Sequence, residues 1–342
     1  MLVRCRSAVI AIALALALAS CGSSAPVSTA SRPLTPAALA KPTNVTLILD
    51  FIPNAVHAGI YRAIAAGYYK AQNIDLHVIR PSSTADTLRL IDAGKAQFGL
   101  ADGSDVANQI ALGRDAETIA ALVQKPLGGL IALAREHLTS AAELEGKTVG
   151  ITGVPSDTAA LETTVAHAGG NPARVHVVTI GFNGAQDLEA GKIAAFTGFW
   201  PDDGVQLQVS GYPIKVFRLD KNGGPAYPGL VAFTTRAVIK SDPRLVRAFV
   251  AATVQGYEDT VQDSQRSLGD LLALNPALRR RLTKASLEQY LPLFTAHGAV
   301  PFGTVQSDKV AALVSWMLHY RLIRKPISPA RYATNAFLPT GS

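Results

Sequence analysis

The sequence has almost no cysteine and few aromatic side chains. Two cysteines and two tryptophans occur in 342 residues, and Phe, Trp and Tyr together make up 6% of the chain. Both cysteines, Cys5 and Cys21, lie near the N-terminus, so the rest of the sequence offers no thiol pair for a disulfide. A hydrophobic core without disulfides is therefore expected to hold the fold.

The sequence also lacks the short motifs of common catalytic sites. HExxH, GxxxxGKS/T, GxSxG and GxGxxG are all absent. The histidines show no metal-ligand spacing; they are His57, His77, His137, His167, His176, His297 and His319. We therefore predict no catalytic residue, no metal site and no cofactor.

Charge is not concentrated in any one segment. The chain has 32 Lys and Arg against 25 Asp and Glu, which gives a formal net charge of +7. The basic residues are scattered, and their single run, Arg279–Arg281, is interpreted as a solvated helix face or loop. No nucleic-acid partner is expected.

Long apolar runs are missing except at the N-terminus. Arg4 and Arg6 precede an apolar run over residues 8–19, which is short for a membrane span and typical of a secretory signal peptide, here residues 1–20. The run ends in Leu-Ala-Ser-Cys, which resembles the bacterial lipobox and implies lipidation of Cys21. Because each buried CH₂ of a lipid chain adds about 0.8 kcal/mol, the protein is expected on the extracytoplasmic face of the cell membrane. The alternative is an ordinary signal peptide with a chance cysteine.

Residues 21–43 are rich in Ser, Pro and Ala and poor in bulky apolar side chains. Such a composition buries too little surface to offset the entropy of ordering, so this segment is predicted to be a flexible tether. The roughly 300 residues that remain are too many for one typical core and suit two lobes.

Two hydrophobic periods alternate along the rest of the chain. Strands are expected near residues 45–49, 76–79, 97–101, 118–123, 129–134, 147–152, 175–179, 194–199, 214–217 and 230–234, and helices near 55–69, 86–93, 157–168, 185–190 and 245–257. This alternation is typical of parallel-rich sheets flanked by helices. The predicted fold is α/β with two lobes, residues 44–128 plus 229–342 and residues 129–228, and the last strand returns to the first lobe.

Ligands of α/β folds bind beyond the carboxyl ends of the parallel strands. Four segments occupy such positions: DFIPNAVH at 50–57, ADGSD at 101–105, TGVPSD at 152–157 and GFWPDDG at 198–204. Ser104 and Ser156 also suit a purely structural role as helix N-caps. In the last segment, a tryptophan beside two acids suits a flat heterocycle that carries amino groups.

The stretch LDFIPNAVHAGIYRAIAAGYYKAQNIDL, followed by RPSSTADTLRLIDAGKAQFGLADG, resembles the thiamine-pyrimidine-precursor branch of the ABC-transporter substrate-binding proteins. The resemblance continues through GKTVGITGVPSD, AGKIAAFTGFW and ATNAFLP and covers nearly all of residues 44–339. It implies a type II periplasmic binding protein that closes on hydroxymethylpyrimidine, formylaminopyrimidine or a similar heterocycle. The implied partners are an ABC permease and its ATPase, and we expect a monomer. Riboflavin and aliphatic sulfonates, ligands of sister groups, are the alternatives.

The resemblance and the strand-end positions together suggest the ligand contacts. Phe51 and Trp200 would stack on the ligand ring from the two lobes. Asp50, with Asp202 or Asp203, would accept hydrogen bonds from amino groups. The other candidates are Asn54, His57, Tyr61, Ser104, Ser156 and Tyr227; packing is the alternative for Phe51 and Tyr61, and a helix-start hydrogen bond for His57. Because Pro201 and two aspartates stand where the family is expected to have one glutamate, the pocket could suit a bulkier ligand such as a flavin.

A fungal branch of the same fold is a synthase that uses its own histidine, a lysine-bound pyridoxal phosphate and a cysteine-rich iron motif. The resemblance places that lysine and histidine at Ala101 and Asp105 of this chain, and the cysteine motif at YPGLVAF, residues 227–233. None of the three features is present. We therefore expect a binding protein and not an enzyme.

Overall fold

The structure is a computed structural model that describes residues 38–294, 298 and 300–339. The predicted signal peptide, Cys21 and residues 21–37 of the predicted tether lie outside the described residues. Every structural statement below concerns the described residues. None of their helices is both long and apolar enough to cross a membrane.

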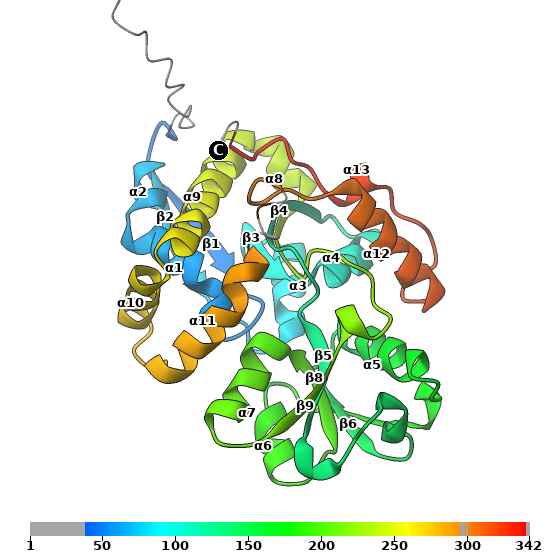
Figure 1. The fold of residues 1–342 in the computed structure, drawn as a ribbon. Coiled ribbons are helices and arrows are strands. Elements are labelled where there is room, and N and C mark those ends of the chain that lie inside the picture. Colours follow the sequence, from blue (N-terminus) through cyan, green and yellow to red (C-terminus); the bar gives the residue numbers. More distant parts are fainter. Residues whose placement is uncertain (1–37, 295–297, 299, 340–342) are drawn as a thin grey trace, which may run out of the picture. The chain divides into compact units, whose positions relative to one another are not determined.

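The first sheet contains five strands in the order β2-β1-β3-β10-β4 (Figure 1). Their bounds are Thr43–Ile48 for β1, Ile74–Ile79 for β2, Phe98–Ala101 for β3, Glu117–Val123 for β4 and Leu230–Thr234 for β10. β1 runs parallel to β2 and β3, whereas β10 runs antiparallel to β3 and β4. Four strands therefore point the same way, and β10 alone is reversed.

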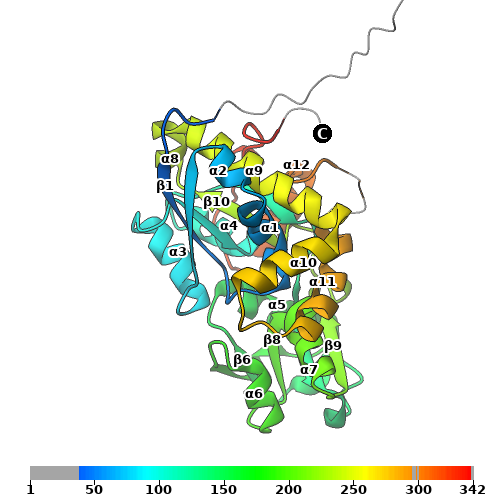
Figure 2. The same cartoon turned by 90° about the vertical axis from the view of Figure 1, so that its left-hand side faces the viewer.

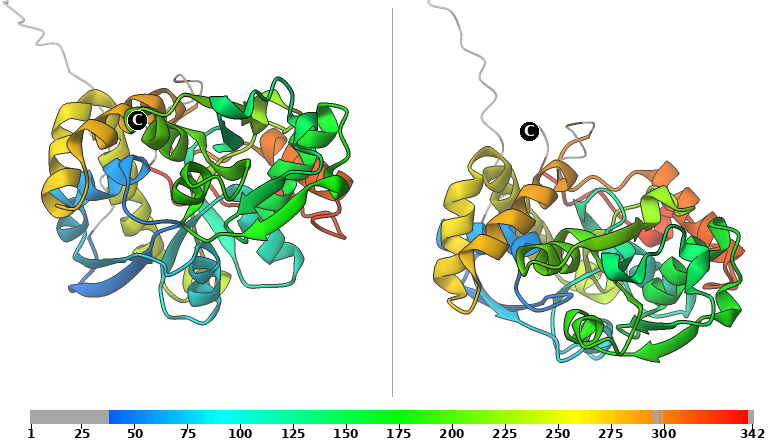
Figure 3. Two further views of the ribbon diagram at one scale, coloured as in Figure 1. Left: turned by 90° about the horizontal axis from the view of Figure 1, so that it is seen from below. Right: turned by 60° about the horizontal axis from the view of Figure 1, so that its bottom comes forward.

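The second sheet contains five strands in the order β7-β6-β8-β5-β9 and is coloured green in Figures 1 and 3. Their bounds are Gly128–Leu133 for β5, Thr148–Ile151 for β6, His176–Thr179 for β7, Ala195–Phe199 for β8 and Ile214–Arg218 for β9. β6 is parallel to β7 and β8, and β5 is antiparallel to β8 and β9. Here β5 is the single reversed strand.

The reversed strands are those that follow the two chain crossings between the sheets, residues 124–127 and 219–229. A chain that crosses from one sheet to the other enters at the edge where the parallel strands end, so it must run against them. The crossings touch, because the N–H of Gly229 donates to the carbonyl of Val123 at 3.0 Å. A Cβ on Gly229 would lie 2.2 Å from the carbonyl oxygen of Lys125, so only glycine fits. The predicted α/β fold class is confirmed, and β10 lies in the first sheet between β3 and β4.

Helices cover both faces of the first sheet (Figures 1 and 2). One face packs against α1 (Ala58–Ala65), α2 (Tyr68–Ala71), α9 (Pro243–Gln262), α10 (Ser264–Leu274) and α11 (Arg280–Phe294). The other packs against α3 (Thr84–Asp92), α4 (Gly103–Ala111), α12 (Ser307–His319) and α13 (Pro329–Tyr332). α8 (Arg236–Ser241) follows β10.

The second sheet is covered in the same way by fewer helices. α5 (Pro155–His167) packs on one face, and α6 (Gly184–Glu189) and α7 (Val205–Val209) pack on the other. Single turns of 3-10 helix occur at Ala55–His57, Ala134–Glu136, Ala141–Leu144, Pro172–Arg174 and Leu219–Lys221, and a π-helical turn at Trp200–Gly204.

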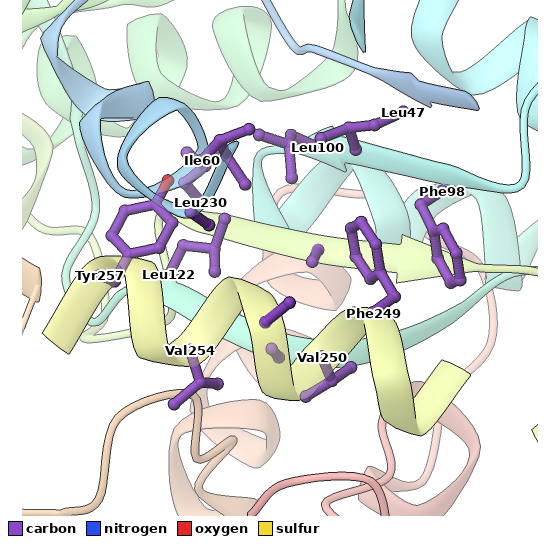
Figure 4. Packing of buried hydrophobic residues seen from close by; sticks show 14 of the residues in the cluster. Leu47, Ile60, Phe98, Leu100, Leu122, Leu230, Phe249, Val250, Val254 and Tyr257 are labelled. Atoms are coloured by element: carbon purple, nitrogen blue, oxygen red, sulfur yellow. The ribbon is translucent and has the colours of Figure 1, made fainter. Parts of the chain in front are cut away.

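Helix α9 holds the larger core together (Figure 4). The apolar stripe predicted for residues 245–257 is buried, including its threonine. Phe249 stacks on Phe98 of β3 with ring centroids 3.8 Å apart, and the hydroxyl of Tyr257 donates to the carbonyl of Val56 at 2.8 Å. Helix α9 therefore fixes the start of α1, which directly follows the first strand-end segment.

Helices α1 and α9 approach each other at glycines. A Cβ on Gly256 of α9 would lie 2.2 Å from the carbonyl oxygen of Gly59 in α1. That oxygen belongs to a helix backbone and cannot move without separating the two helices. In contrast, a Cβ on Gly269 of α10 would meet nothing within 4 Å.

We predict that Gly256→Ala destabilises the protein by about 1–3 kcal/mol, because overpacking outweighs the gain in helix propensity. Gly269→Ala is the matched control and should stabilise the protein by about 0.5–1 kcal/mol. Urea unfolding of both variants measures the difference. Equal stabilities for the two variants would contradict the close approach of α1 and α9.

Candidate functional site

Four strand ends meet at one cavity between the two sheets, with a volume of about 630 Å³ that includes space open to solvent. The segments after β1, β3, β6 and β8 all contribute to its wall. The lining residues are Asp50, Phe51, Asn54, Leu88, Leu100, Ala101, Asp102, Asp105, Thr152, Val154, Ser156, Asp157, Gly198, Phe199, Asp202 and Asp203. Six of them are aspartates, and none of these lining residues is lysine, arginine or histidine.

The segment after β1 is built around a histidine that the cavity does not reach. The backbone N–H of Asn54 donates to Nδ1 of His57 at 3.1 Å, so Nδ1 carries no proton in this arrangement. The proton therefore lies on Nε2, which donates to Oδ1 of Asp50 at 2.8 Å. His57 is completely buried, whereas Asp50 keeps 5% of its surface exposed. His57 thus orients the Asp50 carboxylate from the side that faces away from the cavity.

The segment after β3 enters α4 through Asp102, the N-cap residue of the helix. Oδ1 of Asp102 accepts from the backbone N–H and the hydroxyl of Ser104 at 2.8 and 2.7 Å, and Oδ2 accepts from the hydroxyl of Tyr227 at 3.3 Å. Burial raises the pKa of Asp102 to about 7, and these hydrogen bonds offset only part of that effect. Ser104 and Tyr227 therefore support a carboxylate that lines the cavity.

Asp105 links α4 to α5 across the gap between the sheets. Its Oδ1 accepts from the backbone N–H of Ser156 at 3.0 Å, and its Oδ2 accepts from the Ser156 hydroxyl at 2.8 Å. Burial, and then the charge of Asp102, raise the pKa of Asp105 well above its ordinary range. Ser156 thus contributes both to the cavity wall and to a contact between the two lobes.

Asp157 forms hydrogen bonds with the start of the loop that follows β6. Its Oδ2 accepts from the backbone N–H and the hydroxyl of Thr152 at 2.7 and 2.6 Å, and from the N–H of Gly153 at 3.2 Å. Burial raises its pKa in spite of these donors. The carboxylate holds the loop in the shape that brings Thr152 and Val154 to the cavity.

The segment after β8 makes a π-helical turn that carries two aspartates. Oδ2 of Asp203 accepts from the backbone N–H of Phe199 at 2.8 Å, and Oδ1 of Asp202 accepts from the hydroxyl of Ser286 in α11 at 3.2 Å. Burial is the main cause that raises the pKa of Asp202 to about 6 and that of Asp203 to about 8; the charge of Asp202 adds to the second shift. Helix α11 lies between α10 and this turn (Figure 2).

The two aromatic residues proposed to stack on a ligand are placed differently. Phe51 lines the cavity and makes an edge-to-face contact with Phe182, with ring centroids 4.4 Å apart. Trp200 lies outside the lining, where the guanidinium of Arg218 covers its ring at 3.9 Å from the centroid. In this structure Phe51 faces the cavity, whereas the ring of Trp200 is covered by Arg218.

The structure brings together six of the eleven candidate residues in the cavity wall: Asp50, Phe51, Asn54, Ser156, Asp202 and Asp203. Four others lie behind it, and they are His57, Ser104, Trp200 and Tyr227. Tyr61, expected at the rim, packs in the hydrophobic core because it lies on the inner face of α1.

Sequence reasoning missed Asp102, Asp105, Thr152 and Asp157, although all four lie in the segments it had selected. Asp102 is the N-cap of α4, and Asp105 and Asp157 lie in the first turns of α4 and α5; such structural positions do not exclude exposure to a cavity. The described residues contain no group of three His, Cys, Asp or Glu side chains arranged to hold a metal ion.

The raised pKa values predict how stability depends on pH. Between pH 4 and 8 the folded protein binds more protons at Asp203 than the unfolded chain does, because the folded pKa is about 8 and the ordinary value is 3.8. The free energy of unfolding of the ligand-free protein should therefore fall as pH rises through this window. For Asp203 we expect a loss on the order of 1–3 kcal/mol, after allowance for the side-chain surface open to the cavity.

Asp203→Asn should remove this part of the pH dependence, since the amide oxygen can still accept from Phe199 but does not ionise. Asp75→Asn, at an exposed position on β2, is the matched control and should leave the dependence unchanged. Thermal unfolding at pH 5 and pH 8.5 measures both effects. A slope that is the same in wild type and Asp203→Asn would contradict the assignment.

Comparison with known proteins places the chain in a family. A profile described as NMT1/THI5 like matches residues 54–267. The chain is 29% identical over 288 residues to the formylaminopyrimidine-binding protein of Halalkalibacterium halodurans, covering 83% of this chain and 87% of that one. It is 26% identical to the riboflavin-binding protein RibY of Chloroflexus aurantiacus over the full length of both chains.

The chain is also similar to an enzyme and to a solved structure of a binding protein. A 4-amino-5-hydroxymethyl-2-methylpyrimidine phosphate synthase of Legionella pneumophila is 26% identical over 87% of this chain and 93% of its own. Among solved structures, the alkanesulfonate-binding protein SsuA of Xanthomonas axonopodis superposes with a TM-score of 0.69 and 14% identity, covering 86% of this chain and 99% of that one. From these findings, the chain belongs to the NMT1/THI5-like family and has the two-lobed fold of the periplasmic binding proteins.

Proposed function

We propose that the protein is an extracytoplasmic solute-binding receptor of an ABC importer that captures an aminopyrimidine precursor of thiamine or a similar small heterocycle. The observation that carries this proposal is the cavity between the two sheets, where carboxylates from both lobes face one space. The relative named as a formylaminopyrimidine-binding protein supports the same ligand class. Binding would draw the lobes together around the ligand, and no bond would be made or broken.

Asp50 and Asp202 are the best placed acceptors for ligand amino groups. Oδ1 of Asp50 contacts Nε2 of His57, and Oδ1 of Asp202 contacts the hydroxyl of Ser286, which makes a shorter hydrogen bond, 2.7 Å, to the carbonyl of Pro201. Within the described part of the chain, the second oxygen of each makes no hydrogen bond. A buried amino group left without an acceptor costs about 1–3 kcal/mol, so these two oxygens would select a heterocycle that carries amino groups.

The apolar part of the wall would hold the ring. Phe51 offers an aromatic surface to a ligand, and stacking of this kind contributes about 0.5–1.5 kcal/mol beyond the burial of area. Asn54 already uses its side chain within the loop, since Oδ1 accepts from Val56 at 2.9 Å and Nδ2 donates to Ile52 at 3.3 Å. We therefore assign Asn54 to the shape of the wall and Phe51 to the ring.

Two competing functions receive less support. A sulfonate would need cationic donors, and the described lining residues include no lysine or arginine. A synthase would need a lysine and a histidine where this chain has Ala101 and Asp105. Ala101 has only a methyl group, and Asp105 accepts a hydrogen bond from Ser156. We accordingly propose a binding protein and not an enzyme.

The remaining parts of the proposal concern the cell. Lipidation at Cys21 would anchor the receptor to the membrane, and residues 22–37 would let it reach a permease. The predicted tether is too long at its C-terminal end, because Leu39 packs in the core, its N–H donates to the carbonyl of Gln72, and β1 begins at Thr43. The permease and an ATPase are the proposed partners, with the receptor acting as a monomer. Mass spectrometry of the protein from membranes tests the anchor, since Cys21→Ala should abolish lipid attachment.

The ligand assignment predicts that formylaminopyrimidine binds saturably to the purified chain in isothermal titration calorimetry. Asp50→Asn and Asp202→Asn should each weaken binding by roughly 10- to 100-fold, the value of a hydrogen bond to a charged group. Asp75→Asn is the control outside the cavity and should bind like wild type. Taurine should not bind.

Other results would change the assignment in defined ways. If riboflavin binds and the pyrimidine does not, the proposed receptor role stands and riboflavin becomes its assigned ligand. Binding of no heterocycle at all would refute the proposed function.

A further inference from the structure

The charge of the cavity wall is unusually one-sided. Six aspartates line one space, and the other ten lining residues are uncharged. Two neighbouring arginines are already paired: Arg218 with Asp220 at 2.7 Å, and Arg89 with Asp86. His57 does not line the cavity; its Nδ1 accepts from the backbone N–H of Asn54, and its Nε2 contacts Asp50. No lysine, arginine or histidine is therefore among the described residues that line the cavity.

The donors that satisfy these carboxylates are neutral. Asp102 and Asp157 lie at the starts of α4 and α5, where the helix dipoles supply partial positive charge. Asp105 and Asp203 accept from a serine and from a backbone N–H. Such hydrogen bonds fill lone pairs but do not cancel the mutual repulsion of carboxylates in a space with little water.

The carboxylates of the cavity also act on a buried tyrosine in α11. The hydroxyl of Tyr290 in α11 is fully buried and has no hydrogen-bond partner among the described residues. Burial, and then the charges of Asp202, Asp50 and Asp203, raise the pKa of Tyr290 well above its ordinary range. Tyr290 therefore lies close enough to carboxyl groups of both lobes for their charges to act on its hydroxyl.

Protons can relieve this repulsion while the cavity is empty. The pKa of Asp202 is raised to about 6, that of Asp102 to about 7 and that of Asp203 to about 8, in each case mainly by burial. A ligand that brings positive charge relieves it when the cavity is filled.

We infer that the cavity selects its ligand by charge: it takes the aminopyrimidine as a cation protonated on its ring, and it rejects phosphorylated forms. This inference rests on the proposed function. The amino group and the ring N–H⁺ each present a donor, and the second carboxylate oxygens of Asp50 and Asp202 are open to accept from them. The ring proton comes from solvent or from a cavity carboxyl group.

A groove next to the cavity contains two arginines that could bind a phosphate group and so oppose selection by charge. Leu88 and Val154 line both spaces, and the groove beyond them also contains Arg89 and Arg114. A phosphate on a ligand tail could reach these arginines past Leu88. Arg114 is however bound to Asp92 at 2.9 Å, so both arginines of the groove already have a carboxylate partner.

The test compares 4-amino-5-hydroxymethyl-2-methylpyrimidine with its phosphate ester by isothermal titration calorimetry of the full chain at pH 7. We expect the ester to bind at least 100-fold more weakly. Asp202→Asn should reduce this ratio to less than tenfold, because it removes a charge that attracts the cation and repels the ester. Asp75→Asn should keep the wild-type ratio.

The outcomes separate the two proposals. Equal binding of both compounds, or a ratio that Asp202→Asn leaves unchanged, would overturn selection by charge and leave the receptor function intact. Tight binding of the ester that is lost in Arg89→Ala would also overturn it, in favour of a phosphate site in the groove. If neither compound binds, the charge inference and the pyrimidine ligand fail together.

Discussion

The site depends on the way the chain crosses twice between its two sheets. Each crossing enters a sheet at the edge where the parallel strands end, so that β5 and β10 run against their neighbours. The same edges carry the loops after β1, β3, β6 and β8, and these loops line one cavity. The contact of Gly229 with the first crossing holds the two connections together. Topology thus decides which side chains meet.

The carboxylates at that meeting point oppose the stability of the empty protein. Three of the six are buried and three are half-buried, and their hydrogen bonds orient the carboxylates without neutralising them. Packing elsewhere offsets this cost, above all the α9 core in which Phe249 stacks on Phe98. A cavity that is costly when empty suits a protein that is proposed to bind and release a small ligand, since binding energy is then gained from relief of repulsion.

Local patterns in the sequence were sufficient for the elements and for the site segments. The strand over Leu230–Thr234 and the apolar stripe of α9 could be recognised because backbone periodicity and burial leave a regular pattern of side chains. The four strand-end segments could be selected by their position alone. The neighbours of each side chain could not be predicted in the same way: Arg218, eighteen residues after Trp200 and on β9, covers the Trp200 ring, and no local pattern indicates this contact.

The sequence by itself determined the α/β class, the two sheets and the family, because these follow from periodicity and from stretches of residues close together in the chain. Only the tertiary structure decided which polar residues share the cavity. Asp105 meets Ser156 from 51 positions away, and Asp202 meets Ser286 from 84 positions away. The electrostatic character of the site arises from such long-range neighbours, since the pKa of an aspartate depends on its burial and on charges that no local pattern records.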